Sequence, residues 1–159
     1  MKGNSSKNIK AAITAVGGFV PNDFISNQDL EKVLDTTDEW ITTRTGIKKR
    51  RILKGEGKGT SYLAIKAAED VITKRNIDPD TIDLLIVATI TPDYKGAATA
   101  PSVASAIKAN NAYAFDLSAA CSGFLYGMST ATSYIESGRY KKVLLIGADK
   151  MSSVVDYTR

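Results

Sequence analysis

The sequence predicts an α/β fold with a mostly parallel, mixed sheet and helices on both faces. Two segments, residues 84–88 and 142–147, are rich in apolar residues without alternation, as is typical of strands buried on both faces. Segments with helical apolar spacing separate the strands, and this alternation favours right-handed crossovers between parallel strands. A chain of 159 residues with 43% hydrophobic content fits one globular unit, so we expect a single domain over residues 1–159.

The first predicted elements are a strand and a short helix. Residues 8–16 are expected to form an opening strand. Ser26 is a good N-cap for a helix over residues 27–34, and Asp29 is well placed in its first turn.

Two further helices follow, with a loop between them. Thr37 precedes two acidic residues and opens a helix through residue 44, which Gly46 ends. A loop rich in glycine and lysine over residues 54–59 leads to a longer helix over residues 60–75, whose apolar residues recur at helical spacing.

The second half of the sequence repeats the alternation around the buried strand at residues 84–88. A loop over residues 91–98 leads into a helix over residues 100–109, and residues 112–116 form the next strand. A turn rich in alanine and serine then leads to a helix over residues 121–137, which Gly138 ends.

Charge and hydropathy argue against two classes of partner. The net charge is +4, and the one basic cluster, residues 48–51, has no aromatic platform beside it. Nucleic-acid binding is one interpretation of that cluster, but a solvated surface turn is the better one. The apolar run at residues 84–88 is too short to cross a bilayer, and the polar N-terminus lacks the apolar stretch of a secretory signal. We therefore expect a cytoplasmic protein with no nucleic-acid or membrane partner.

Cysteine and histidine content narrows the chemistry. The chain has one cysteine and no histidine. An internal disulfide and a cysteine-rich zinc site are both excluded, so no metal site is predicted.

Cys121 is the candidate nucleophile. It follows a predicted strand and a tight turn, at or near the start of a helix, where free N–H groups and the helix dipole stabilise a thiolate. Small neighbours allow a substrate carbonyl to approach the sulfur, and the Cys121 amide could face an oxyanion. The alternative is a buried structural cysteine, since free cysteine is among the most buried residue types. The sequence offers no histidine as the base that usually activates such a nucleophile.

Three segments carry a resemblance to a known family. Residues 38–47 (DEWITTRTGI), residues 114–124 (AFDLSAACSGF) and residues 137–149 resemble, in order and spacing, β-ketoacyl-[acyl-carrier-protein] synthase III of the thiolase superfamily. The similarity covers about residues 9–158. The first segment is the specific one, because related elongating synthases lack it, whereas the cysteine turn is shared across the superfamily.

The resemblance implies a thiolase-like fold and an acyltransferase activity. An acyl-CoA primer, often acetyl-CoA, would acylate Cys121, and malonyl-acyl carrier protein would then condense with loss of CO₂. Trp40 and Arg44 would sandwich the CoA adenine, and Thr36 would contact the nucleotide. No cofactor beyond the CoA thioester substrate is implied, and the family forms homodimers.

Simpler interpretations exist for the CoA-binding residues. Trp40 could be a core residue, and Arg44 alone would be an ordinary surface charge. Their spacing of four residues places both on one side of a helix, and an indole and a guanidinium both stack on a base. The pair therefore favours nucleotide binding more than either residue does.

The sequence departs from the family in two respects. The family's second half supplies a histidine and an asparagine, and this chain is expected to be an amino-terminal half, incomplete at its C-terminus and inactive alone in condensation. Gly96 lies where many relatives carry a bulky residue that closes the acyl pocket, which predicts a pocket for primers longer than acetyl.

Two other functions remain open at this point. The first is a related condensing enzyme of the same fold, acting on CoA thioesters in polyketide, quinolone or hydroxymethylglutaryl-type pathways. The second is a non-catalytic half that pairs with a complementing chain. Retention of the cysteine argues against the second.

Overall fold

A computed structural model describes residues 9–157 of the chain, which fold into two compact units. Unit 1 comprises residues 9–19 and 60–149, and unit 2 comprises residues 20–59 and 150–157. The prediction of a single domain over residues 1–159 stays a prediction.

Unit 1 is built on a parallel three-stranded sheet. The strands are β3 (Leu84–Ala88), β4 (Tyr113–Leu117) and β5 (Val143–Gly147), in the order β4-β3-β5. Both pairings are parallel, and Ala88 lies in register with Leu117 on one side and with Gly147 on the other. Every residue of β3 is buried, as expected of a central strand.

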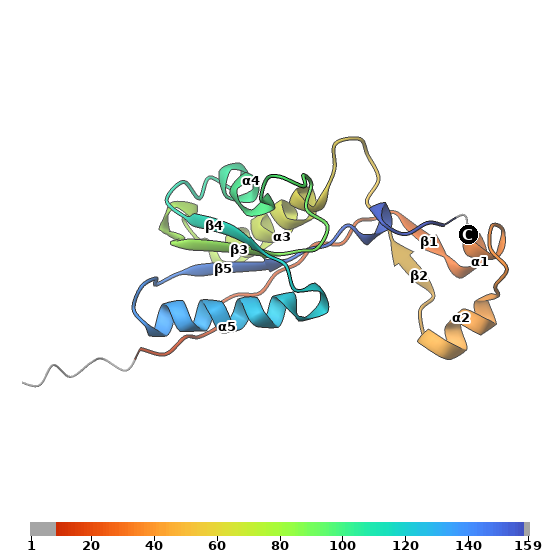
Figure 1. Cartoon of the computed structure of the whole chain (residues 1–159), viewed down its shortest axis with the longest axis horizontal. Coiled ribbons are helices and arrows are strands. Elements are labelled where there is room, and N and C mark those ends of the chain that lie inside the picture. Colours follow the sequence, from red (N-terminus) through yellow and green to blue (C-terminus); the bar gives the residue numbers. More distant parts are fainter. Residues whose placement is uncertain (1–8, 158–159) are drawn as a thin grey trace, which may run out of the picture. The chain divides into compact units, whose positions relative to one another are not determined.

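Helices cover both faces of this sheet (Figure 1). Helices α3 (Thr60–Arg75) and α4 (Thr99–Ala106) pack on one face, and α5 (Gly123–Glu136) packs on the other. The apolar core lies between the sheet and the α3–α4 layer, and its largest buried members are Ile82, Leu85, Val87 and Val103. This arrangement confirms the α/β fold prediction.

Unit 2 is smaller and relies on short elements. Strands β1 (Phe24–Ser26) and β2 (Lys49–Arg51) pair antiparallel, and helices α1 (Asn27–Glu31) and α2 (Asp38–Thr45) lie between them in sequence. Three short 3₁₀ turns complete the described chain: η1 (Pro79–Thr81) and η2 (Ala120–Ser122) in unit 1, and η3 (Met151–Ser153) in unit 2.

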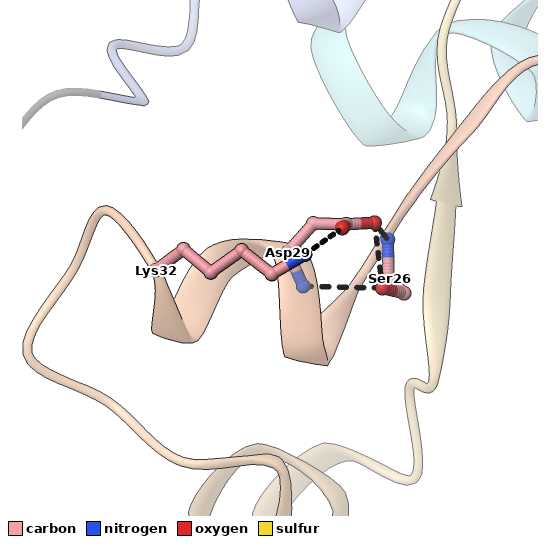
Figure 2. A network of polar contacts seen from close by, with 3 residues as sticks. All are labelled: Ser26, Asp29 and Lys32. Carbon is pink, nitrogen blue, oxygen red and sulfur yellow. Dashed lines mark hydrogen bonds and ion pairs between the residues drawn. The ribbon is translucent and has the colours of Figure 1, made fainter.

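Both predicted helix starts in unit 2 are confirmed. Ser26 and Asp29 form a reciprocal capping box, and the Asp29 carboxylate also accepts from Lys32 at 3.0 Å (Figure 2). These bonds, first that from the Ser26 hydroxyl and then that from Lys32, hold the pKa of Asp29 well below its usual value. Thr37 caps α2, and Gly46 ends it with φ of 69°.

The predicted opening strand is the largest error. Of residues 8–16, residue 8 lies outside the described residues, and residues 9–16 form no strand. This segment makes side-chain contacts instead: Lys10 pairs with Glu136 at 3.4 Å, and the following Gly18 N–H donates to Asp70. A strand requires hydrogen bonds from a neighbouring strand, and residues 9–16 join no ladder in the described chain.

The prediction of a surface turn for the basic cluster is also wrong, because residues 49–51 form strand β2. Its side chains also make contacts within unit 2. Arg51 donates to the carbonyls of Pro21 and Asn22, and Lys49 lies 5.0 Å from the centroid of the Phe24 ring.

Other helix boundaries shift for local reasons. Helix α1 stops at Glu31, three residues early, and the Glu31 carboxylate accepts the N–H of Asp38 at the start of α2. Helix α4 stops at Ala106 because Lys108 has φ of 62°, outside the helical region.

Candidate active site

Cys121 lies in the turn between strand β4 and helix α5. The turn η2 includes Cys121, and α5 begins two residues later at Gly123, slightly beyond the predicted start. Ala120, directly before the cysteine, has φ of 47°, a left-handed conformation that is costly for a residue with a Cβ. The thiol is free and exposed, so the interpretation as a buried structural cysteine is wrong.

Two glycines bring α5 close to the sheet behind this turn. A Cβ on Gly123 would lie 3.4 Å from the Ala88 Cβ, and one on Gly127 would lie 2.5 Å from a Leu145 methyl group. The second distance is shorter than real Cβ contacts, so only glycine fits there without a shift of Leu145. The position of Cys121 is therefore fixed by close packing of the helix that follows it.

The turn belongs to the carboxyl edge of the parallel sheet, where α/β proteins bind ligands. Residues Ala88, Leu117 and Gly147 share one register at this edge. The loop of residues 91–98 leaves β3 here, and the cysteine turn leaves β4.

Two aspartates organise this edge, and sequence reasoning missed both. The Asp149 carboxylate accepts from the Thr89 hydroxyl at 2.9 Å and from the Ile90 N–H at 2.8 Å. The Asp116 carboxylate accepts the N–H groups of Thr99 and Ala100, each at 2.7 Å, and so caps helix α4. The available signal was an aspartate at or just after the end of an apolar strand.

Gly96 lies in the exposed loop between β3 and α4. Apart from Gly96 itself and its two chain neighbours, no described residue has an atom within 4 Å of the place where its Cβ would be, so the space around it is open. Two residues earlier, Tyr94 has 72% of its surface exposed, and it forms an isolated bridge with Ala97. The prediction of a roomier pocket considered Gly96 and not this bulky neighbour.

The predicted CoA-binding residues lie together in unit 2. Thr36 and Trp40 line a surface cavity of about 240 Å³ with Asp35 and Thr37. That volume is below the roughly 300–1,000 Å³ typical of ligand pockets, so the cavity suits part of a ligand rather than all of it. Trp40 has 53% of its surface exposed, which excludes the core-packing interpretation.

Arg44 stacks directly on Trp40. The guanidinium carbon lies 4.5 Å from the centroid of the indole ring, a cation–π contact within helix α2. A base inserted between the two planes needs about 3.5–4 Å on each side, roughly 7–8 Å in total. In this structure the two groups fill that space themselves, so Arg44 must move before a base can enter.

Metal binding and membrane insertion find no support in the described residues. Between residues 9 and 157, no group of three or more histidine, cysteine, aspartate or glutamate side chains could hold a metal ion. None of the helices in the same range has the length and apolar character needed to cross a membrane.

A parallel sheet between helix layers, with an exposed cysteine between a strand and a helix, fits a thiolase-like fold. Solved structures agree with this class. The chain matches the 3-oxoacyl-[acyl-carrier-protein] synthase III of Aquifex aeolicus with a TM-score of 0.88 and 47% identity, over 95% of this chain and 48% of that one. The priming β-ketosynthase of the R1128 polyketide pathway gives a TM-score of 0.91 at 31% identity, over 100% of this chain and 47% of that one.

Sequence comparisons identify the particular relatives. A family profile described as 3-oxoacyl-[acyl-carrier-protein (ACP)] synthase III matches residues 115–159. The β-ketoacyl-[acyl-carrier-protein] synthase III of Chlorobaculum tepidum is 57% identical over 149 residues, which cover 94% of this chain and 45% of that protein. The chain is therefore homologous to β-ketoacyl-[acyl-carrier-protein] synthase III, and it spans about half the length of these relatives.

Proposed function

We propose that this chain carries the acyl-accepting cysteine of a β-ketoacyl-[acyl-carrier-protein] synthase III. The observation that carries the proposal is an exposed Cys121, held between β4 and α5 at the carboxyl edge of a parallel sheet. The similarity to synthases of that name, at 57% identity for one of them, supports it. The class of reaction is acyl transfer, as a step of fatty acid synthesis.

The first step is a thioester exchange. The sulfur of Cys121 attacks the carbonyl carbon of an acyl-CoA primer and forms a tetrahedral intermediate. The bond between that carbon and the CoA sulfur then breaks, the CoA thiolate takes up one proton in exchange for the proton that the Cys121 thiol lost, and the acyl group remains on Cys121. N–H groups at the start of α5 supply partial positive charge for the anions in this step.

The second step is a decarboxylative condensation. Malonyl-acyl carrier protein loses CO₂, and the resulting carbanion attacks the acyl carbonyl carbon on Cys121. The product is 3-oxoacyl-acyl carrier protein, and the cysteine is released. Because the sequence contains no histidine, the histidine that stabilises the enolate in the family must come from outside these residues, and we propose the same source for the asparagine that acts with it. We expect the 159 residues alone to be inactive in condensation.

Unit 2 supplies the CoA contacts in this proposal. Thr36 lies beside Trp40 in the surface cavity, and Arg44 stacks on the same indole. Arg44 would move away from Trp40, and adenine would enter between the indole and the guanidinium, which can also pair with a CoA phosphate. No metal or cofactor beyond the CoA thioester takes part.

The primer preference follows from Gly96. Gly96 stands where many relatives carry a bulky residue that closes the acyl pocket, and we propose that its small size leaves room for primers longer than acetyl. In the complete protein, turnover with butyryl-CoA or isobutyryl-CoA should exceed turnover with acetyl-CoA. The protein would be a cytoplasmic homodimer whose partners are acyl-CoA and malonyl-acyl carrier protein, without nucleic acid or membrane.

Mass spectrometry tests the first step directly. After incubation with acetyl-CoA or butyryl-CoA, the protein should gain one acyl group, and peptide mapping should place it on Cys121. The Cys121→Ser variant is the matched control and should give no thioester adduct. An unmodified Cys121 in folded protein would refute the proposal and favour a non-catalytic half.

A polyketide-priming enzyme is the second candidate. The match to the R1128 priming β-ketosynthase extends over 100% of this chain. Assays with carrier proteins from fatty acid and polyketide systems would separate the two, since each enzyme should condense only with its own carrier.

A further inference from the structure

We infer that Asn27 is the positioning residue of the nucleotide-binding helix α2, an inference that rests on the proposed function of Trp40 and Arg44. Asn27 is the first residue of α1, and it is completely buried within unit 2. A buried asparagine must satisfy both its amide N–H₂ group and its carbonyl oxygen, so its partners fix its orientation.

The side chain of Asn27 joins three segments that are distant in sequence. Its Nδ2 donates to the Asp38 carboxylate at 2.7 Å and to the Ile47 carbonyl at 2.8 Å, with a longer contact to the Thr42 hydroxyl at 3.3 Å. Its Oδ1 accepts from the guanidinium of Arg50 on β2. One carboxamide therefore connects both ends of α2 to β2.

Helix α2 depends on such contacts because it has little apolar anchorage. It is eight residues long, and Ile41 is its only buried residue. Isolated helices of this length are marginal in water, and packing normally supplies their stability. Here the bonds to Asp38 and Thr42 replace much of that packing, and they act on the same helix that carries Trp40 and Arg44.

The inferred role is therefore specific. Asn27 touches no proposed substrate group, but it sets the orientation of the helix on which the indole and the guanidinium face the nucleotide. Removal of its donors should weaken recognition of the nucleotide part of CoA. Chemistry at Cys121 itself should not change.

Two acyl donors distinguish this role from a general loss of folding. Acetyl-CoA carries the nucleotide, whereas S-acetyl-N-acetylcysteamine carries the same thioester without it. Adduct formation on Cys121 is followed by mass spectrometry at subsaturating donor, in the complete protein if the 159 residues form part of a longer chain. Asn27→Asp keeps the size and the acceptor for Arg50 but loses the N–H₂ donors beside Asp38.

We expect Asn27→Asp to react roughly tenfold or more slowly with acetyl-CoA and at an unchanged rate with S-acetyl-N-acetylcysteamine. Thr42→Val removes one partner of the network and should give a smaller change in the same direction, which keeps the inference testable if Asn27→Asp folds poorly. Asn110→Asp is a control for the same substitution at an exposed site, since Asn110 also donates to a carboxylate, that of Asp80 in unit 1. It should leave the preference between donors unchanged.

A double-mutant cycle supplies the decisive readout. If Asn27 acts through Trp40 and Arg44, Asn27→Asp should have almost no further effect on the reaction with acetyl-CoA in a background in which both are removed, Trp40→Ala with Arg44→Ala. Equal losses for both donors, or additive effects in the cycle, would overturn the inference. A wild-type protein that acylates Cys121 but shows no preference for acetyl-CoA would refute the nucleotide site itself, and no acylation by either donor would refute the proposed function.

Discussion

Cys121 in unit 1 and Trp40 in unit 2 are held in place by different interactions. The helix after Cys121 lies against the sheet through Gly123 and Gly127, so its position is set by apolar contact. The helix that carries Trp40 has one buried residue and is held by hydrogen bonds from Asn27 and from caps. The nucleophile should therefore be sensitive to side-chain volume, and the nucleotide-binding helix to the loss of polar groups.

The first prediction enlarges a side chain in unit 1 and has the largest effect. Gly127→Val places a branched side chain where a Cβ alone would lie 2.5 Å from Leu145. Overpacking of this kind typically costs about 1–3 kcal/mol, and we expect the upper end. The midpoint of urea unfolding, followed by far-UV circular dichroism, should fall accordingly.

Gly96→Val is the matched control for that steric effect. It is the same substitution at a position with open space, so the free energy of unfolding should change by no more than about 0.5 kcal/mol. Equal losses for the two variants would mean that contact with Leu145 is not the cause.

The second prediction removes a cap in unit 2. The Thr37 hydroxyl accepts the N–H of Trp40 at 3.0 Å, and Thr37→Val keeps the shape but removes that acceptor. Loss of an N-cap costs about 1 kcal/mol. Trp40 is the only tryptophan in the chain, so its fluorescence during urea unfolding reports unit 2 specifically.

Thr43→Val serves as the control on the same helix. The Thr43 hydroxyl donates to the carbonyls of Glu39 and Trp40 within α2, so its loss leaves no N–H group without an acceptor. If Thr43→Val lowers the stability of unit 2 as much as Thr37→Val does, the cap is not what holds α2, and the contrast drawn between the two units fails.

The third prediction concerns acid and has the smallest effect. The lowered pKa of Asp29 means that its ionised form stabilises the folded state above the unfolded value of about 3.9. This stabilisation should disappear as the pH falls through the lower folded pKa. An asparagine at this position cannot titrate. In Asp29→Asn the stability of unit 2 should therefore fall less steeply as the pH is lowered, again measured by Trp40 fluorescence during urea unfolding.

Asp70 provides the corresponding test in unit 1. Its pKa is lowered by Lys74 and by the N–H of Gly18. In Asp70→Asn the stability followed by circular dichroism should therefore fall less steeply as the pH is lowered, and the Trp40 signal should stay unchanged. A change in both signals would contradict the separate action of the two carboxylates.

The elements that the sequence predicted well are those whose pattern is local. Helix α3 has the predicted bounds, Thr60–Arg75, because one continuous helical spacing defines it. Strand β3 was recognised from its unbroken apolar run, and the caps at Ser26 and Thr37 from residue type and spacing.

The features that were missed depend on contacts between distant residues. A strand over residues 9–16 required a neighbour that no local pattern specifies, and the Asn27 network joins positions 11 to 23 residues apart. The stacking of Arg44 on Trp40 was also unforeseen, although their spacing placed them together. Sequence patterns found the candidate site residues but not the polar groups that hold them.

The left-handed conformation of Ala120 has a consequence for how the sulfur meets its substrate. A residue with a Cβ resists this conformation, so the surrounding structure must impose it before any thioester arrives. Replacement by glycine would relax the backbone and let the turn sample other shapes. The strained alanine therefore means that one backbone shape of the turn that carries Cys121 is already set before an acyl group arrives.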